Sequence, residues 1–507
     1  MADGGRILSA DDILSDTIVD CDLVVVGTGA GGAMALRDAA RAGLRVIAVE
    51  EGGHHQPKDF TQRERAMLAL LFQDGACRQT RDGGVIVLQG RGVGGSTVHN
   101  TNLCKRAPER VLAEWAERCG LADWSHDKLI DDFAAVESDL HVSDIDLARV
   151  NRNNQILLDG MKALGWRGGI LRHNRRGCIG SGFCELGCAY DAKENAAKLL
   201  VPDAVSHGAV VYTEARAERV IREGDRATGI IARGARAQLT IRARAVALAG
   251  SAVGSAALAL ASGLGERSPR VGTNLHLHPG AAVAGIFKER VEGWVGIPQS
   301  VECTEHIDWE PGSDKRTWII PAFAHPIGLA SMLPGFGAEH MRRLRQYPNV
   351  AVLVAMLHDQ SAGRVTVTRK GSPQIDYTLL ESDRRALVAG VVACARLLLA
   401  AGATEVIVPA TRPYIVRSER DLAAVSAHNV RIADPPLTAA HPMGTLPMAA
   451  DPARGVTDAR GAFHGTRGLY VCDGSLFPTS LGGPPQISIY TAGRRVARAI
   501  IEDLRRA

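Results

Sequence analysis

The sequence predicts an α/β fold in which a doubly wound parallel sheet is joined to a second region of antiparallel strands and helices (α+β). Three observations lead to this prediction. Residues 21–50 read as strand, glycine turn, helix and strand, which is one βαβ unit. Alternating residues over 210–249 indicate short antiparallel strands. From 280 to about 432, strand-like runs accompany one helix over 382–401, which predicts a separate layer.

The first unit follows from residue type and order. The run 21–27 is apolar, rich in valine and closed by a glycine, as expected for a buried strand. Strong helix formers fill 33–41, and Gly43 ends that helix. A second apolar run, 44–50, completes the unit. This order requires parallel pairing of the two strands.

The middle of the chain alternates between helices, a loop and strands. Amphipathic helical patterns cover 59–74 and 108–142, whereas 172–188 is rich in Gly, Cys and Arg and has no period, so we expect a loop there. An antiparallel meander is predicted to lead into a strand at 245–249. Its four strands are 210–213, 219–222, 227–232 and 238–242.

The C-terminal region contains two strand-like runs, 350–356 and 363–368, before the helix at 382–401. A last helix is predicted to start at Pro484-Pro485, because proline suits the first turn. Apolar residues follow at helical spacing, and the predicted helix ends in several arginines. Positive side chains at this end interact favourably with the negative end of the helix dipole.

Composition excludes several classes of protein. The chain has 507 residues, 46% hydrophobic and 22% charged, which argues against disorder, and 59 basic against 55 acidic residues give a net charge of +4 without long runs. We therefore expect no nucleic-acid partner. We see no export signal before Asp20 and interpret the charge-free stretch 245–265 as strand, turn and helix, so we expect a cytoplasmic protein without a transmembrane segment. Ten cysteines would then be thiols or metal ligands.

A glycine motif of the form G-x-G-x-x-G joins the first strand to the first helix. It consists of Gly27, Gly29 and Gly32, and Glu50 ends the following strand. Such glycines let backbone N–H groups approach a pyrophosphate at the helix N-terminus, and the carboxylate can bind a ribose hydroxyl. The motif predicts a dinucleotide site but does not separate FAD from NAD.

A second glycine cluster, Gly90-Arg-Gly-Val-Gly-Gly-Ser-Thr-Val-His-Asn100, lies some sixty residues further along. Closely spaced glycines allow the backbone to lie flat against another surface. One long cofactor that contacts the chain twice would explain both clusters. An unusual loop without a ligand is the alternative.

Together with two C-terminal motifs, these segments resemble the glucose–methanol–choline (GMC) family of FAD-dependent oxidoreductases. The two motifs are His441-Pro-Met-Gly-Thr445 and Leu469-Tyr-Val-Cys-Asp-Gly-Ser-Leu-Phe-Pro478, the latter followed by Gly482 and Pro485. The similarity is greatest to the long-chain alcohol oxidase and bacterial sugar dehydrogenase branches, because of Gly363-Arg-Val and the cysteine-rich loop.

The resemblance implies a Rossmann-like FAD-binding domain with a parallel sheet, assembled from 19–104, 194–280 and 440–507, and a substrate domain with an antiparallel sheet from 105–193 and 281–439. It also implies which residues bind FAD. Those on the ADP half are Gly27, Gly29, Gly32 and Glu50, with Val220 beside the adenine. Those nearer the flavin are Gly92, Gly94, Gly95, Ser96, His99, Asn100, Asp473, Gly474, Pro485 and Gln486.

By its position in the motif, His441 resembles the catalytic base of the family. A neutral imidazole can take the alcohol proton near pH 7 while the flavin takes the hydride. Relatives carry Asn or His where this chain has Pro484, which offers no side-chain donor. A second hydrogen bond to the substrate oxygen would come from Gln486, a backbone N–H or a water, or be absent. The helix starting at Pro485 would stabilise negative charge on reduced flavin.

His99 occupies the place at which some relatives attach FAD covalently through histidine, whereas other relatives bind FAD there without a bond. Both alternatives stay open. His276 and His278 are interpreted as structural, because their segment resembles the return of the chain into the FAD domain.

The loop 172–188 carries Cys178, Cys184 and Cys188, preceded by arginines. Three thiolates at flexible spacing can surround one metal centre. Their spacing resembles the [3Fe-4S] loop of a bacterial FAD-dependent glucose dehydrogenase. Structural thiols and a zinc site, with His173 near, are the alternatives.

The sequence thus predicts an FAD-dependent alcohol dehydrogenase that passes electrons to a protein or quinone acceptor, with the cysteine loop as a relay. Apolar runs at 321–324 and 327–333 favour a hydrophobic or cyclic alcohol as the small-molecule substrate. Three alternatives are an oxidase that uses O₂, a GMC-like lyase or photodecarboxylase, and an electron-transfer flavoprotein.

Overall fold

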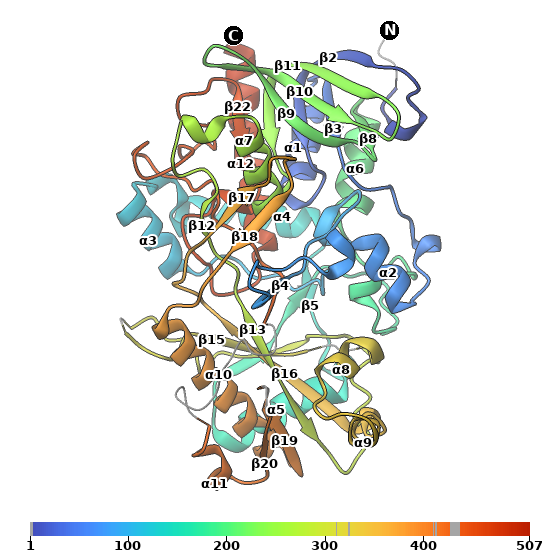
Figure 1. The fold of residues 1–507 in the computed structure, drawn as a ribbon, viewed down its shortest axis with the longest axis vertical. Coiled ribbons are helices and arrows are strands. Elements are labelled where there is room, and N and C mark those ends of the chain that lie inside the picture. The colour runs from blue at the N-terminus through green and yellow to red at the C-terminus, as the bar shows by residue number, and fades with distance from the viewer. Residues whose placement is uncertain are drawn as a thin grey trace.

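The chain builds two large sheets, one in the upper and one in the lower half of Figure 1. The computed structural model describes residues 4–310, 312–322, 325–408, 410, 413–425 and 437–506, without the side chains of 331 and 332. The α/β fold class predicted from the sequence is confirmed.

The upper sheet has eight strands and is parallel in its central part. Its order is β1 (Arg6–Ser9), β8 (Val210–Thr213), β3 (Val46–Val49), β2 (Thr17–Val26), β11 (Gln238–Leu248), β10 (Arg226–Arg233) and β9 (Arg216–Glu223), with β22 (Leu469–Val471) also on β11. The predicted βαβ unit is confirmed, since β2 and β3 pair in parallel and α1 (Ala30–Arg41) connects them.

One strand differs from the prediction. Strands β9, β10 and β11 form the expected antiparallel meander, but β8 pairs in parallel with β1 and β3 instead of joining it. Three of the four residues of β8 are buried, as is usual for a strand covered on both faces. A short apolar run does not reveal which strand it will pair with, so this partner was not readable from local sequence.

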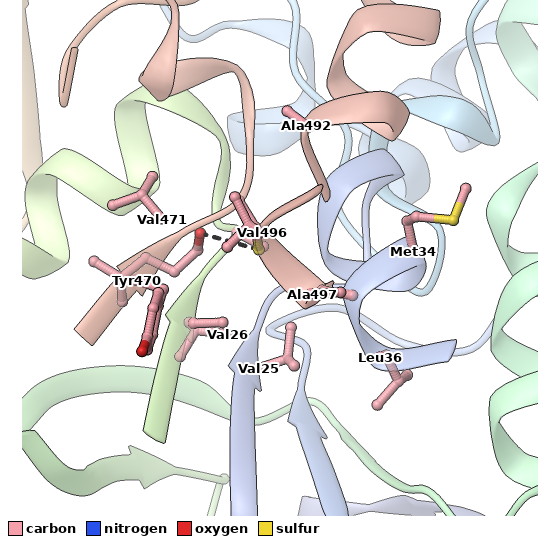
Figure 2. Packing of buried hydrophobic residues seen from close by; sticks show 14 of the residues in the cluster. Val25, Val26, Met34, Leu36, Tyr470, Val471, Ala492, Val496 and Ala497 are labelled. Carbon is pink, nitrogen blue, oxygen red and sulfur yellow. Dashed lines mark hydrogen bonds between the residues drawn. The ribbon is translucent and has the colours of Figure 1, made fainter. Parts of the chain in front are cut away.

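The core of the upper half lies between this sheet and two helices, α1 and α12 (Gln486–Arg506). Figure 2 shows residues of β2, α1, β22 and α12 packed together there. The two helices cross closely at two glycines. A Cβ atom at Gly493 would lie only 2.4 Å from the carbonyl oxygen of Gly31. A Cβ at Gly31 would in turn lie 1.8 Å from the carbonyl oxygen of Cys472. Glycine is therefore required at this crossing.

The lower sheet has nine strands and is mainly antiparallel. Its order is β20 (Tyr414–Val416), β19 (Glu405–Val408), β13 (Gly280–Ile286), β16 (Val350–Leu357), β15 (Thr317–Pro321), β14 (Val301–Cys303) and β6 (Gly168–Ile170). The strand β21 (Leu437–Ala439) links β13 to β4 (Val85–Val87). The long helix α10 (Glu381–Ala400) covers the sheet together with α5 (Arg152–Leu164).

A three-stranded sheet of β12 (Thr273–Leu275), β17 (Gly363–Val367) and β18 (Pro373–Asp376) lies between the two halves (Figure 1). The domain boundaries given above remain a prediction. One strand that falls within the predicted FAD domain, β4, pairs with the lower sheet.

The remaining elements are α2 (Glu64–Leu71), α3 (Glu109–Cys119), α4 (His126–Asp139), β5 (Ser143–Asp144), β7 (Arg172–His173), α6 (Ala196–Ser206), α7 (Ser251–Ala261), α8 (Pro326–Met332), α9 (Ala338–Leu344) and α11 (Glu419–Leu422). Among them, α2, α3, α4 and α7 fall within predicted helical stretches, whereas the others were not predicted and β7 lies at the start of the segment expected to be a loop. The helix expected over 59–74 is shorter, because Arg63 and Phe72 on either side of α2 have extended backbone angles. Among the helices described, none has the length and apolar character needed to cross a membrane.

Candidate functional site

The first glycine turn lies between β2 and α1. Gly27 has a φ of +99°, and a Cβ there would lie 2.4 Å from the carbonyl oxygen of Ala249. A Cβ at Gly32 would lie 2.0 Å from the carbonyl oxygen of Gly27, so both glycines are required by close packing. A Cβ at Gly29, the residue that caps α1, would meet nothing within 4 Å. This open space at a helix N-terminus fits a pyrophosphate group.

The second glycine segment packs directly onto the first. A Cβ at Gly95 would lie 3.0 Å from the Cα of Gly29. The backbone N–H of Gly94 donates to the hydroxyl oxygen of Thr28 at 3.2 Å. The backbone of 90–100 therefore continues the surface made by the first turn, which is the arrangement that one cofactor contacting both segments would need.

Glu50 joins the two segments through its carboxylate. Its Oε2 accepts from the backbone N–H of Thr28 at 3.1 Å and from the Thr28 hydroxyl at 2.8 Å. Its Oε1 accepts from the N–H groups of Gly52 and Gly92, each at 3.1 Å. Burial raises the pKa of Glu50. The carboxylate thus stabilises the loop geometry.

The C-terminal motifs reach the same place. The N–H of Gly444, within the His441 motif, donates to the carbonyl oxygen of Gly474 at 3.0 Å. Asp473 accepts from the Ser255 hydroxyl at 2.6 Å, and burial raises its pKa. Because Gly31 packs against Cys472, all three separated segments meet around the N-terminal end of α1.

His441 contacts a second histidine. Its Nδ1 lies 3.2 Å from Nδ1 of His278, and the two rings are nearly perpendicular at 88°. Nε2 of His278 accepts from the N–H groups of Leu481 at 3.1 Å and Gly482 at 2.9 Å. The hydrogen of neutral His278 therefore lies on Nδ1 and is donated to His441. Burial lowers the pKa of His441 to about 4, so the ring is neutral at pH 7.

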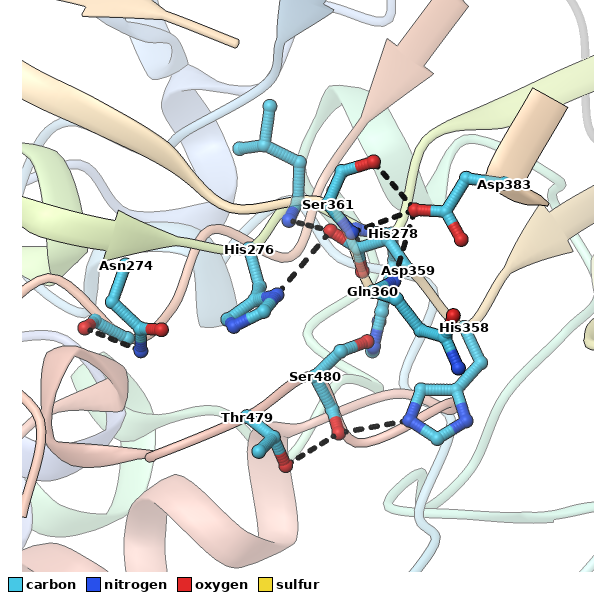
Figure 3. Close-up of polar contacts among 12 residues, drawn as sticks. Asn274, His276, His278, His358, Asp359, Gln360, Ser361, Asp383, Thr479 and Ser480 are labelled. Atoms are coloured by element: carbon cyan, nitrogen blue, oxygen red, sulfur yellow. Dashed lines mark hydrogen bonds and ion pairs between the residues drawn. The ribbon is translucent and has the colours of Figure 1, made fainter. Parts of the chain in front are cut away.

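A polar cluster behind this pair was missed by the sequence reasoning (Figure 3). Asp359 accepts from the backbone N–H of Leu277 at 3.0 Å and of His278 at 3.2 Å, and from the Tyr377 hydroxyl at 2.7 Å. It lies 3.6 Å from Nδ1 of His276. The pKa of Asp359 is held far below its usual range by these hydrogen bonds and by the imidazoles, against its burial. The cluster fixes the backbone that carries His278.

His358 binds the loop that follows β22. Its Nε2 donates to the carbonyl oxygen of Ser480 at 3.0 Å, next to the two N–H groups bound by His278 (Figure 3). The segment 480–482 is therefore bound by two imidazoles, those of His358 and His278. The two histidines near Pro279 were visible in the sequence, but nothing in it pointed to His358 or Asp359.

Gln486 is buried at the start of α12 with both ends of its amide bound by the protein. Its Oε1 accepts from Asn100 Nδ2 at 2.9 Å, and its Nε2 donates to the carbonyl oxygen of Leu103 at 2.5 Å. Gln486 thus joins the second glycine segment to the C-terminal helix. Pro484 and Pro485 precede that helix, as the sequence predicts.

His99 and Val220 are both buried. The ring of His99 lies 3.9 Å from that of Phe72, its Nε2 has no hydrogen-bond partner among the described residues, and burial lowers its pKa to about 3. Val220 lies on β9, and its N–H donates to the Ser262 hydroxyl at 2.9 Å.

The three cysteines of the loop line one pocket. Cys178, Cys184 and Cys188 are among the residues that line a shallow pocket open to solvent. Backbone N–H groups point at two of the sulfur atoms, from Gly180 to Cys178 at 3.4 Å and from Ala192 to Cys188 at 3.3 Å. His173 is not among the lining residues. In the part of the chain that the structure describes, no three Cys, His, Asp or Glu side chains converge closely enough to hold a single metal ion.

A parallel sheet with two glycine turns at its first helix, in a chain that also holds a neutral and partly buried imidazole in a C-terminal motif, is typical of a dinucleotide-dependent oxidoreductase. The family models for GMC oxidoreductases match residues 68–280 and 359–493. The chain belongs to the GMC family of FAD-dependent oxidoreductases.

Two relatives illustrate this membership. A GMC-type oxidoreductase of Mycobacterium tuberculosis is 36% identical over 500 residues, which cover 97% of this chain and 77% of the relative. A long-chain-alcohol oxidase of Arabidopsis thaliana is 28% identical over 521 residues, covering 96% of this chain and 67% of the relative.

Solved structures share the fold. Pyridoxine 4-oxidase from Mesorbium loti has a TM-score of 0.73 at 18% identity, covering 94% of this chain and 99% of that one. Formate oxidase from Aspergillus oryzae has a TM-score of 0.70 at 15% identity, covering 97% and 100%. At these identities the likeness concerns the fold.

Proposed function

We propose that the protein oxidises an alcohol, hydrophobic or cyclic, to its carbonyl compound with FAD as the acceptor. The observation that carries this proposal is that the motif of His441, a neutral and partly buried imidazole, is bonded through Gly444 to Gly474, close to Cys472, which packs on Gly31 at the start of α1. The family is one of FAD oxidoreductases, and a relative of 28% identity is a long-chain-alcohol oxidase.

Residues on three segments would hold FAD. Gly27, Gly29, Gly32 and Glu50 would take the ADP half, with Val220 beside the adenine. The residues assigned to the flavin half are Gly92, Gly94, Gly95, Ser96, His99, Asn100, Asp473, Gly474, Pro485 and Gln486. When bound, the flavin supplies the acceptor for the hydride that leaves the alcohol carbon.

His441 would accept the proton of the alcohol. A pKa of about 4 keeps the imidazole unprotonated at pH 7, as a base requires. The contact with His278 imposes a condition, because the hydrogen donated by His278 occupies Nδ1 and leaves the hydrogen of neutral His441 on Nε2. Proton uptake at Nε2 therefore requires the His278 contact to open. Nitrogen-15 spectra of histidine-labelled protein would show the Nε2–H tautomer before substrate is added; the Nδ1–H tautomer would contradict this pairing.

The start of α12 would stabilise negative charge that develops during the reaction. The helix begins at Gln486, and its first N–H groups are those that an α-helix leaves without partners. Pro484 provides no side-chain donor. Because the Gln486 amide is bound to Asn100 and Leu103, the backbone of α12 or a water is the better second donor to the substrate oxygen.

The cysteine pocket would pass electrons onward. Three cysteines around one cavity, with N–H groups directed at two sulfur atoms, support an iron–sulfur centre held by Cys178, Cys184 and Cys188. The electron acceptor would then be a protein or a quinone.

The substrate would lie beside the lower sheet. Of the apolar runs that suggested a hydrophobic alcohol, residues 323 and 324 lie outside the described residues. In the other run, Leu329 and Leu333 are buried, while Ile327 is 54% exposed.

Anaerobic mixing of the yellow protein with a series of alcohols tests the proposal. A hydrophobic or cyclic alcohol should bleach the flavin absorbance rapidly, and free sugars should bleach it at a lower rate. A panel in which no alcohol bleaches the flavin would overturn the proposal.

Two other functions each rest on one observation. The name of the plant relative supports an oxidase that uses O₂, and rapid reoxidation of the reduced protein by air would identify it. Pro484 supports a lyase, because proline lacks the side-chain donor of the Asn or His that relatives carry at this position. A lyase would turn over its substrate without net bleaching of the flavin.

A further inference from the structure

The helices α8 and α9 expose apolar side chains to water. The two helices follow each other through the turn 333–337, and both lie at the right-hand edge of the lower half in Figure 1. Ile327 in α8 is 54% exposed, Phe336 in the turn is 95% exposed, and Met341 in α9 is 50% exposed. Single exposed apolar residues are common on protein surfaces, but a group of large ones in one short segment indicates a site of interaction.

The inner side of the same segment is packed. Leu329 and Leu333 are buried against β13, β16 and β19 of the lower sheet. The three exposed side chains take no part in any hydrophobic cluster of the described residues. A second surface that covered them would therefore gain hydrophobic free energy without disturbing the core.

A pocket open to solvent extends this apolar surface. Leu329 lines it from α8, together with Trp294 and Tyr347. The rings of Trp294 and Tyr347 stack with their centres 4.4 Å apart, and the next residue, Val295, is 49% exposed. The exposed apolar surface thus continues from α8 and α9 to the loop that carries Trp294.

Arginines accompany the apolar side chains of α9. Residues 326–345 contain three arginines and one glutamate, and that glutamate, Glu339, pairs with Arg343 at 3.3 Å. Arg342 and Arg345 are exposed and form no ion pair with any described residue. Met341 and Arg345 are four positions apart, so apolar and basic side chains share one side of the helix.

The helix α2 adds positive charge at the start of α8. The carboxylate of Glu64 accepts from the backbone N–H groups of Ile327 at 2.8 Å and Gly328 at 3.1 Å, so α2 lies against α8. Arg63 and Arg65, on either side of Glu64, are exposed and have no ion pair within the described part of the chain. The surface around the exposed apolar side chains is therefore basic.

We propose that this side of α8 and α9 docks on the surface of an anionic lipid bilayer. Ile327, Phe336 and Met341 enter the boundary between headgroups and acyl chains, and Arg342 and Arg345 bind lipid phosphates. Phe336 projects from a turn between two glycines. A fluid bilayer accepts a single projecting ring without a preformed pocket, whereas a protein partner would have to supply one. A basic surface also suits anionic lipid better than a second copy of the same basic surface.

Flotation with lipid vesicles tests the proposal on the full-length protein with bound flavin. Vesicles of phosphatidylcholine alone are compared with vesicles of equal parts phosphatidylcholine and phosphatidylglycerol. We expect wild type to bind the mixed vesicles more tightly and to lose this preference at high salt. Phe336→Ser should weaken binding to the mixed vesicles about tenfold or more. Arg342→Gln with Arg345→Gln should weaken it about fivefold for each arginine, and only on the mixed vesicles.

Leu14→Ser and Arg236→Gln are the matched controls. Leu14 is 72% exposed, Arg236 is exposed, and both lie beside strands of the upper sheet. We expect both controls to float like wild type. Because the Phe336 side chain is almost fully exposed, its replacement removes no internal packing, and Phe336→Ser should melt at the temperature of wild type.

Three results would overturn the proposal. The first is wild-type protein that stays off the mixed vesicles at low salt. The second is Phe336→Ser protein that floats as well as Leu14→Ser. The third comes from size-exclusion chromatography with light scattering, in which a wild-type dimer that Phe336→Ser converts into a monomer would assign this surface to a second copy of the chain.

Discussion

The hydrogen bond from His278 to His441 determines which ring nitrogen of His441 can take up a proton. The motif around His441 allowed its position to be predicted, because a histidine followed by Pro-Met-Gly-Thr is specific. Its contact with His278 was not predictable, since the two residues are 163 positions apart and meet only in the folded chain. Reactivity at this site depends on a contact between distant segments.

Replacing His441 by alanine tests its role directly. We expect Ala to leave FAD bound, because no hydrogen bond that holds the glycine segments involves this side chain, and to slow bleaching by alcohol about 10²–10⁴-fold. Anaerobic stopped-flow absorbance measures the rate. His207→Ala, an exposed histidine at the end of α6, is the control. A His441→Ala rate equal to that of the control would remove His441 from the chemistry.

The pH dependence of the same reaction follows from burial. Because the pKa of His441 is lowered to about 4, the imidazole stays neutral well below the usual 6.5. We expect kcat/KM to fall only when the pH approaches 4. A decline already centred near pH 6.5 would show that the imidazole is solvated in the working enzyme.

Secondary-structure elements were predictable where local signals were strong. The βαβ unit followed from its glycines, and the last helix from its two prolines. The parallel pairing of β8 and the N-terminal strand β1 were not predicted, because pairing depends on strands far away in the chain.

The crossing of α1 and α12 allows a test at this scale. We expect Gly493→Ala to lower the free energy of unfolding by about 1–3 kcal/mol, because its Cβ would lie 2.4 Å from the Gly31 carbonyl oxygen. Urea unfolding followed by circular dichroism measures the change.

Gly254, in α7, provides the control for this substitution. A Cβ there would meet nothing within 4 Å, so Gly254→Ala should raise stability by about 0.5–1 kcal/mol through its helix propensity. Equal effects of the two substitutions would contradict the close crossing.

For the molecule as a whole, the sequence indicated where the cofactor segments lie but not how they are held together. The glycine motifs were visible as motifs. The role of Glu50 in joining Thr28 to Gly92, and the burial of Lys193 beside the cysteines, depend on contacts across 42 and 95 positions. Charge and hydrogen-bond partners of this kind become visible only with the fold.

Many buried histidines make the molecule sensitive to acid. Burial lowers the pKa of His99 and His173 to about 3, and of His306, His325 and His441 to about 4. The unfolded chain takes up these protons near pH 6.5, whereas the folded protein does not. Their contribution to stability is complete above pH 6.5 and is lost as the pH falls toward 4.

Three carboxyls with raised pKa values, Glu50, Glu185 and Asp473, act in the opposite direction but are fewer. We therefore expect the melting temperature to fall steadily between pH 6.5 and pH 4. Differential scanning fluorimetry at constant ionic strength measures it. A melting temperature that stays level or rises over this range would show that the imidazoles are not buried in solution.

The upper sheet contains strands from both ends of the chain, β1 near residue 6 and β22 near residue 470. During synthesis, the ribosome releases the first glycine turn long before the strand and helix that pack against it. The growing polypeptide would therefore expose an incomplete nucleotide site, and flavin uptake would have to wait until β22 and α12 have been synthesised.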